Sequence, residues 1–79
     1  MPASEASEIY VALLDEPVTV WRPVQAELVH DGVYRIVEQP YDRNVERWEF
    51  EPGEHVKCES VESTEGRILA ATARDDAAE

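Results

Sequence analysis

The side chains best suited to nucleophilic or metal chemistry in this sequence are one cysteine, Cys58, and two histidines, His30 and His55. Cys58 alternates in phase with Val56, so we expect it on the buried face of a strand, where a free thiol behaves as a small apolar group. A reactive cysteine needs an electropositive, partly exposed setting, which this acidic sequence does not supply. We therefore predict no catalytic cysteine.

The two histidines lack the neighbours of a metal site. His30 precedes a predicted turn at Asp31-Gly32, and His55 follows another at Pro52-Gly53. Neither has a histidine or cysteine partner at metal-ligand spacing, so both are expected at the surface. The sequence predicts neither a metal nor a cofactor.

Neighbouring carboxylates act as a general acid and base only where a pocket separates their pKa values. The adjacent pairs Asp15-Glu16 and Asp75-Asp76 fall in a predicted turn and a predicted tail, where no pocket is expected. We therefore predict that the protein is not an enzyme.

The charge of the chain restricts its partners. Asp and Glu number 18 against 7 Lys and Arg, which gives a formal net charge of −11 over 79 residues. Nucleic acids and anionic membranes are both bound through cations, so neither is an expected partner. A basic protein partner fits this charge, and so does a role in solubility alone.

An acidic strand surface is the first candidate for binding. Residues 47–50 alternate in hydrophobicity and are predicted to form a strand with Trp48 and Phe50 facing inward. The outward face and the ends of this strand then carry four glutamates: Glu46, Glu49, Glu51 and Glu54. Clustered carboxylates favour association with a cationic partner, so we interpret them as a rim for a Lys- or Arg-rich protein, with a solvated surface as the alternative.

Two aromatic side chains complete the candidate protein-binding residues. Trp21 points away from Val20 and Val24, and Tyr41 lies in the polar stretch 38–46. Tryptophan and tyrosine dominate binding hot spots, so both are candidates for a partner surface. Packing in the core is the alternative for each.

The pattern around these residues is that of short strands. A chain of this length forms one domain with a small core. We predict a five- or six-stranded all-β barrel over residues 8–73, with disordered tails at 1–7 and 74–79. The expected strands cover residues 8–14, 18–29 with a bend at Arg22-Pro23, 33–37, 47–50, 55–61 and 67–73. The last of these has helix as its alternative, because leucine and alanine favour helix.

Three features indicate the compartment. A lone cysteine cannot form an internal disulfide, no apolar run reaches the length of a membrane span, and the first residues do not resemble a signal peptide. A cytoplasmic location is expected.

Three stretches of the sequence resemble those of a group of short, uncharacterised bacterial proteins. They are VWRPV at 20–24, DGVYRI at 31–36, and WEFEPG at 48–53 running on to VKCE at 56–59. The resemblance covers about residues 9–61 and implies a bacterial source and a compact β fold, without an activity. The pattern also looks like that of SH3 and Tudor domains, which implies an SH3-like barrel; fold alone does not assign function.

Our leading hypothesis from the sequence is a small acidic protein-binding module that regulates or inhibits a basic protein. The alternative is a homo-oligomeric barrel without a ligand, paired through an edge strand in residues 9–14 or 67–73. A small-ligand binder or an enzyme has the least support.

Overall fold

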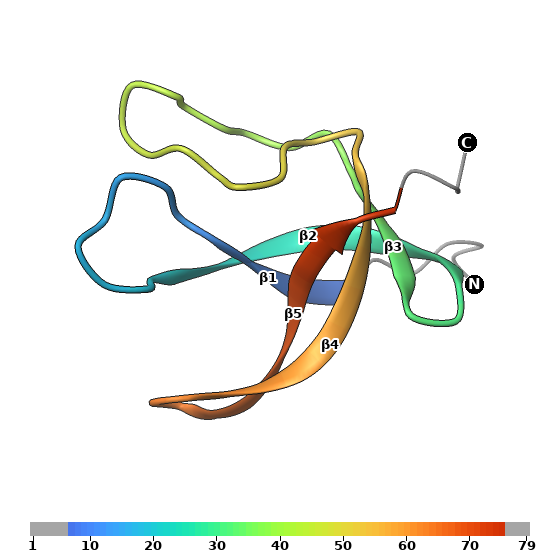
Figure 1. Cartoon of the computed structure of the whole chain (residues 1–79). Helices are drawn as coiled ribbons and strands as arrows, with labels where there is room; N and C mark the ends of the chain where they lie inside the picture. The colour runs from blue at the N-terminus through green and yellow to red at the C-terminus, as the bar shows by residue number, and fades with distance from the viewer. Residues whose placement is uncertain (1–6, 76–79) are drawn as a thin grey trace.

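A computed structural model describes residues 7–75, and every structural statement below concerns that range. Five strands form a closed barrel in the order β1-β2-β3-β4-β5 (Figure 1). The strands are β1 (Ser7–Ala12), β2 (Trp21–His30), β3 (Val33–Ile36), β4 (His55–Ser63) and β5 (Gly66–Arg74). The prediction of an all-β barrel is confirmed, and no helix in this range is long and apolar enough to cross a membrane.

The predicted turns and the final strand are confirmed. Asp31-Gly32 joins β2 to β3, and Gly32 adopts a φ of 75°, a left-handed conformation that glycine takes without strain. Residues 67–73 lie within β5, so strand rather than helix is correct. The strands extend one residue beyond the predicted domain at each end, because Ser7 begins β1 and Arg74 ends β5. The rest of the predicted tails, apart from Asp75, lies outside the described residues.

The predicted strand at residues 47–50 is wrong, although its inward-facing residues were identified correctly. Trp48 and Phe50 are only 5% and 6% exposed. The backbone here forms a single bridge, between Trp48 and Leu13, flanked by hydrogen bonds from Leu14 N–H to Arg47 C=O (2.7 Å) and from Glu49 N–H to Ala12 C=O (2.8 Å). Its only sheet neighbour is the short segment after β1, which is too short to extend the ladder.

Residues 37–54, which we call the strap, connect β3 to β4 without regular strands. Figure 1 shows the strap in green and yellow, arching over β1 and β2 on the side away from the β4–β5 hairpin. It supplies Trp48 and Phe50 to a core built mainly from the inward residues of the barrel. These are Ile9, Val11, Val24, Ala26, Ile36, Val56, Cys58 and Ala71.

Pro23 lies inside β2, opposite Tyr10 of β1. Pairing of β2 with β3 begins only at Ala26, so β2 is an edge at Pro23, where the missing N–H is tolerated. The irregularity in β2 falls between Leu28 and His30 rather than at the predicted bend. The predicted strand start at Val18 is also too early, because β2 begins at Trp21 and Val18 is 68% exposed.

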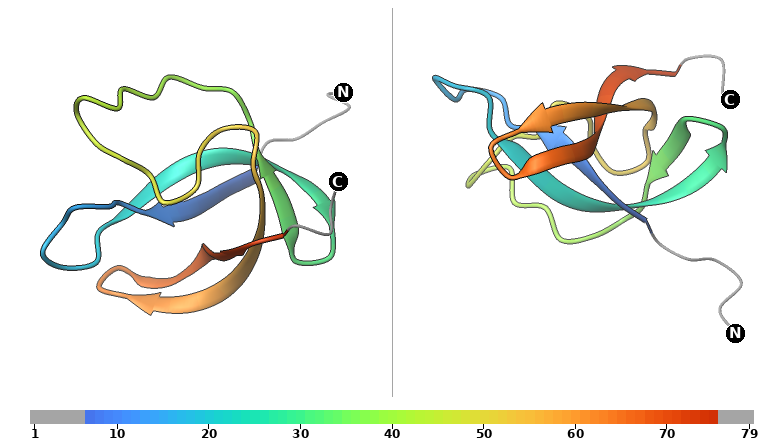
Figure 2. Two further views of the ribbon diagram at one scale, coloured as in Figure 1. Left: turned by 45° about the horizontal axis from the view of Figure 1, so that its top comes forward. Right: turned by 90° about the horizontal axis from the view of Figure 1, so that it is seen from below.

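The barrel closes through a narrow contact between its first and last strands. β1 and β5 run parallel and share one pair, Tyr10 opposite Ala70. By contrast, β4 and β5 pair along their length to the turn at Ser63 and Gly66. The β4–β5 hairpin therefore continues past the contact with β1 and projects from the barrel, as the two views of Figure 2 show.

Candidate protein-binding groove

The strap glutamates expected to form a free acidic rim are mostly engaged within the molecule. The Glu46 carboxylate accepts a hydrogen bond from Arg22 Nε (2.7 Å) and another from Trp48 Nε1 (2.7 Å). The hydrogen bond and charge of Arg22, with the hydrogen bond from Trp48, lower the pKa of Glu46 to about 2. Glu46 therefore fastens the strap to β2 and is not a free carboxylate.

Glu51 and Tyr41 form a second cluster on the strap. The Glu51 carboxylate accepts two hydrogen bonds from Arg43, at 2.9 and 3.2 Å, and this pairing lowers its pKa. The Tyr41 ring stacks on Trp48 with centroids 4.3 Å apart, and its hydroxyl oxygen accepts a hydrogen bond from Trp48 N–H (2.8 Å). The half-buried Tyr41 ring thus packs within the strap and also lines an open pocket with Arg22 and Pro23.

The remaining strap glutamates differ from each other. Glu54 accepts hydrogen bonds from Arg74 Nε (2.7 Å) and from the Glu51 backbone N–H (2.9 Å). Glu49 is exposed and has no ion-pair partner among the described residues. The candidate binding residues from the sequence were Trp21, Tyr41, Glu46, Glu49, Glu51 and Glu54. Among them, only the side chains of Trp21 and Glu49 make no hydrogen bond or ion pair with another described residue.

Arginine pairing explains where the negative charge remains. Each of the six arginines in residues 7–75 has a carboxylate within 4 Å, which leaves Lys57 as the only cation of this range without an acidic partner. The carboxylates without a basic partner in the same range are Glu8, Glu16, Asp31, Glu38, Asp42, Glu49, Glu59 and Glu65. The net negative charge of this range therefore resides mainly on these groups.

The register of the sheet gathers apolar side chains on the outer face of the barrel. Tyr10 is paired with Pro23 on one side and with Ala70 on the other, so the three side chains lie in one row. The neighbouring row contains Ala12 opposite Trp21. Both rows face away from Ile9, Val11 and Val24, which fill the core.

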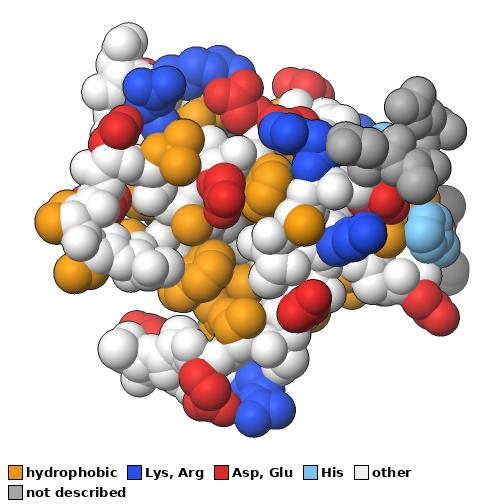
Figure 3. Space-filling view, in the orientation of Figure 1, with side chains coloured by type: hydrophobic (Ala, Val, Ile, Leu, Met, Phe, Trp, Pro, Cys, Tyr) orange, Lys and Arg blue, Asp and Glu red, His pale blue; other side chains and the backbone are white. Residues whose placement is uncertain are grey.

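An open groove lies between this outer face and the projecting β4–β5 hairpin. Its volume is about 740 Å³, and Tyr10, Trp21, Pro23 and Ile68 form its apolar walls. Thr19, Val20 and the hairpin residues 62–65 complete the lining. In Figure 3, hydrophobic side chains gather above the hairpin, and the surface is hollowed between them and its tip. The volume of the groove falls within the range of about 300–1,000 Å³ that is usual for ligand-binding clefts.

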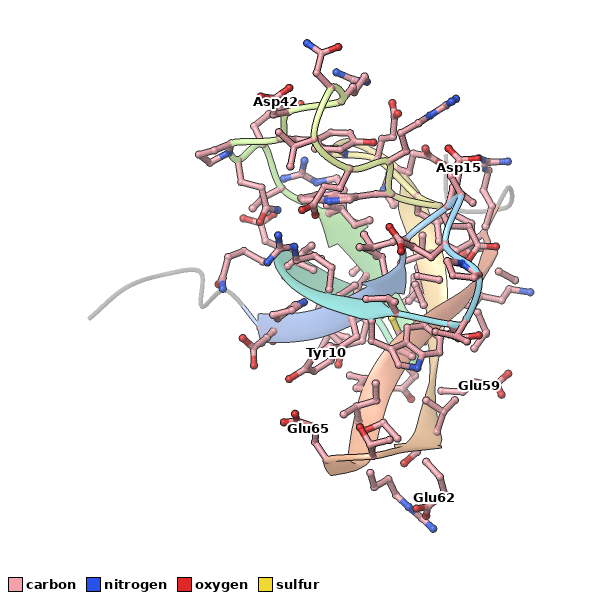
Figure 4. All side chains as sticks on the ribbon, turned by 90° about the vertical axis from the view of Figure 1, so that its left-hand side faces the viewer. Tyr10, Asp15, Asp42, Glu59, Glu62 and Glu65 are labelled. Carbon is pink, nitrogen blue, oxygen red and sulfur yellow. The ribbon has the colours of Figure 1, made fainter. Side chains whose placement is uncertain are left out.

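Two glutamates of the hairpin, Glu62 and Glu65, are among the residues that line the groove. Glu65, in the hairpin turn, has no cationic partner among the described residues, whereas Glu62 is paired with Arg67 at 2.9 Å. Figure 4 shows Tyr10 on the side of β1 that faces the hairpin and Glu65 at the turn below it, while Glu62 points away. Glu59 of β4 lies opposite Ala70 but is not among the residues that line the groove.

Two of the residues first considered for chemistry, His30 and Cys58, line one open pocket together with Lys57 and Asp75, and His55 is not among its lining residues. Cys58 is 9% exposed, and burial raises the pKa of its thiol to about 11, so it is almost entirely protonated at neutral pH. His30 lies 4.0 Å from the carboxylate of Asp75, and no group of three or more potential metal ligands occurs in residues 7–75. His55 begins β4.

Sequence reasoning found Trp21 and missed the rest of the groove. The alternation of residues 9–14 indicated that both faces of this strand are covered, which was the available signal for Tyr10. The approach of residues 62–68 to Trp21 depends on how β5 crosses β1, and no local pattern encodes that crossing.

Comparison with known proteins gave no match: no family model, no curated sequence and no solved structure resembles this chain closely enough to be reported.

Proposed function

We propose that this protein is a non-enzymatic binding module that recognises a cationic segment of another protein in the groove formed by Tyr10, Trp21, Pro23 and Ile68. One observation carries the proposal: the apolar groove has an unpaired carboxylate, Glu65, among its lining residues, while the arginines of residues 7–75 are neutralised internally. Regulation or inhibition of a basic protein is the role that fits such a module.

The groove offers contacts both to the aliphatic stem and to the charged head of an arginine or lysine side chain. The aliphatic stem can lie on Ile68 and Pro23, since such stems cover apolar surface while the charged head stays in water. Aromatic faces such as those of Tyr10 and Trp21 attract cations. Glu65 then offers a carboxylate to the head group, and a carboxylate of this kind favours both encounter and register.

The proposal replaces the strap by the groove as the binding surface. Glu46, Glu51 and Glu54 already have arginine partners, so a new cation at any of them competes with an existing ion pair. The Tyr41 ring is stacked on Trp48.

A bacterial origin also forms part of this proposal. The resemblance of residues 9–61 to short bacterial proteins is the feature that supports it.

A labelled peptide of alternating arginine and threonine tests the proposed function by fluorescence anisotropy. We expect Trp21→Ala to weaken binding about tenfold, because truncating an aromatic anchor removes its contact area. Glu65→Gln is expected to weaken it about threefold at low salt and less at high salt, as for an exposed ion pair.

Two substitutions on the strap serve as matched controls. Glu49→Gln makes the same charge change as Glu65→Gln at another exposed, unpaired glutamate. Val45→Ala truncates an apolar side chain that is 74% exposed. Both variants are expected to bind like the parent protein. Equal loss of affinity in Glu49→Gln and Glu65→Gln, or unchanged binding in Trp21→Ala, would contradict the proposal.

A further inference from the structure

We infer that the groove holds its partner as an added β-strand, paired with the free edge of β5 at residues 66–69. This inference rests on the proposed function, because it specifies how the cationic segment is bound. β5 is paired with β4 from Gly66 onward, but on its other side β1 is paired with it only at Ala70. Residues 66–69 therefore have no strand neighbour on that side within the described chain.

The free edge and the groove occupy the same place. β1 covers the edge at Tyr10 and then diverges from β5, and the groove fills the space between them. Ile68 belongs to the free edge and also lines the groove with Tyr10 and Trp21. A segment lying in the groove can thus meet side chains and unpaired backbone groups together, which is the arrangement used in strand addition.

The geometry limits the length and pattern of the partner segment. Four edge residues at about 3.3 Å each span about 13 Å, enough to pair with three or four residues of an extended chain. Side chains alternate between faces along such a strand. Arginine or lysine at every second position would therefore place its cations on one face, toward Tyr10, Trp21 and Glu65.

The charge of the protein favours a cationic segment at the β5 edge over a second copy of the chain. Pairing two β5 edges would bring together two molecules that each carry a net charge of −11, with the exposed Glu65 in the turn at the end of each edge. Like charges facing each other suppress association. A cationic segment instead gains attraction at the same edge. An open edge is a hazard for self-pairing, and this negative charge opposes it as charged edge residues do.

Amide hydrogen exchange measured by NMR on the full chain tests the inference, with the alternating arginine–threonine peptide as probe. Pairing with an added strand protects from exchange those β5 amides that point away from β4. Such amides occur at every second residue along the strand. We expect exchange to slow about tenfold or more for at least one amide among Arg67, Ile68 and Leu69 when peptide is bound, while the amide of exposed Glu49 is unchanged. The same peptide with every amide N-methylated keeps its charge but lacks N–H donors, and is expected to bind more weakly without slowing exchange.

The outcomes separate the binding mode from the proposed function. Binding of both peptides with unchanged exchange at residues 66–69 would overturn strand addition and leave a cationic-segment module in place. Failure of the unmodified peptide to bind at low salt would overturn both the binding mode and the proposed function. Exchange at these amides that is already slow without peptide, and that slows further as the protein concentration rises, would assign the edge to a second copy of the chain. That result would overturn the inference.

Discussion

Tyr10 of β1 and Ala70 of β5 form the one residue pair that joins the first and last strands within residues 7–75. Ala70 is completely buried although it lies in the outward-facing row of the sheet with Tyr10. The contact closes the barrel and also marks where β5 leaves β1, so the same pair is responsible for closure and for the groove beside it.

The close packing at this pair predicts that a larger side chain at position 70 is destabilising. Ala70→Leu should lower the free energy of unfolding by about 1–3 kcal/mol, because extra methylene groups in a filled site force neighbours apart. Ala73→Leu, on an exposed part of β5, is the control and should change it by less than about 0.5 kcal/mol. Urea denaturation of both variants measures the difference, and equal effects would mean that the contact is not tightly packed.

The two tryptophans should have separable roles. Trp48 is 5% exposed in the core and holds Tyr41 and Glu46, so Trp48→Ala should cost about 3–5 kcal/mol of unfolding free energy. Trp21 is half-buried on the outer face, so Trp21→Ala should cost less than half as much. Thermal and urea unfolding of the two variants make the comparison. A larger cost at Trp21 would place it in the structural core and remove it from the binding surface.

Glu46 should give part of the stability a defined pH dependence. Its pKa is about 2 in the folded protein against an ordinary value of 4.5, so the stabilisation is complete above about pH 4.5 and is lost as the pH falls toward 2. Glu46→Gln removes this titration and should lower the unfolding free energy at pH 7 by about 1–3 kcal/mol, since Arg22 and Trp48 lose a charged acceptor.

The measurement is the difference in unfolding free energy between the parent protein and Glu46→Gln across pH 2 to 7. Other carboxylates titrate in both proteins, so the difference isolates Glu46. It should shrink steadily below about pH 4.5. A difference that stays constant down to pH 2 would show that the ion pair with Arg22 does not lower the pKa of Glu46.

Local signals account for the parts of the fold that were predicted correctly. Asp31-Gly32 specifies its turn through the φ of Gly32, and the alternation of Val56 and Cys58 marks the buried face of β4. Trp48 and Phe50 were recognised as buried, but their segment lacks the continuous neighbour that a strand requires. Long-range relationships could not be predicted: Arg22 reaches Glu46 across 24 residues, and the groove depends on Tyr10 meeting Ala70.

Burial of Cys58 predicts an unreactive thiol. With a pKa of about 11, about one thiol in a thousand is ionised at pH 8, against about a quarter for an ordinary cysteine. A disulfide reagent such as dithiobisnitrobenzoate should therefore react with the native protein at least about a hundredfold more slowly than with protein unfolded in urea. Similar rates in the two states would contradict the buried position of Cys58 in β4.

Mapping the cationic peptide onto the protein by NMR tests the central claim most directly, because it asks where binding occurs without altering the chain. Titration of the arginine–threonine peptide into ¹⁵N-labelled protein should shift the amide signals of Tyr10 and Ile68 and the indole signal of Trp21. The amides of Tyr41 and Glu49 and the indole of Trp48 should remain in place. Shifts confined to the strap, or spread evenly over the acidic surface, would contradict a binding site in the groove.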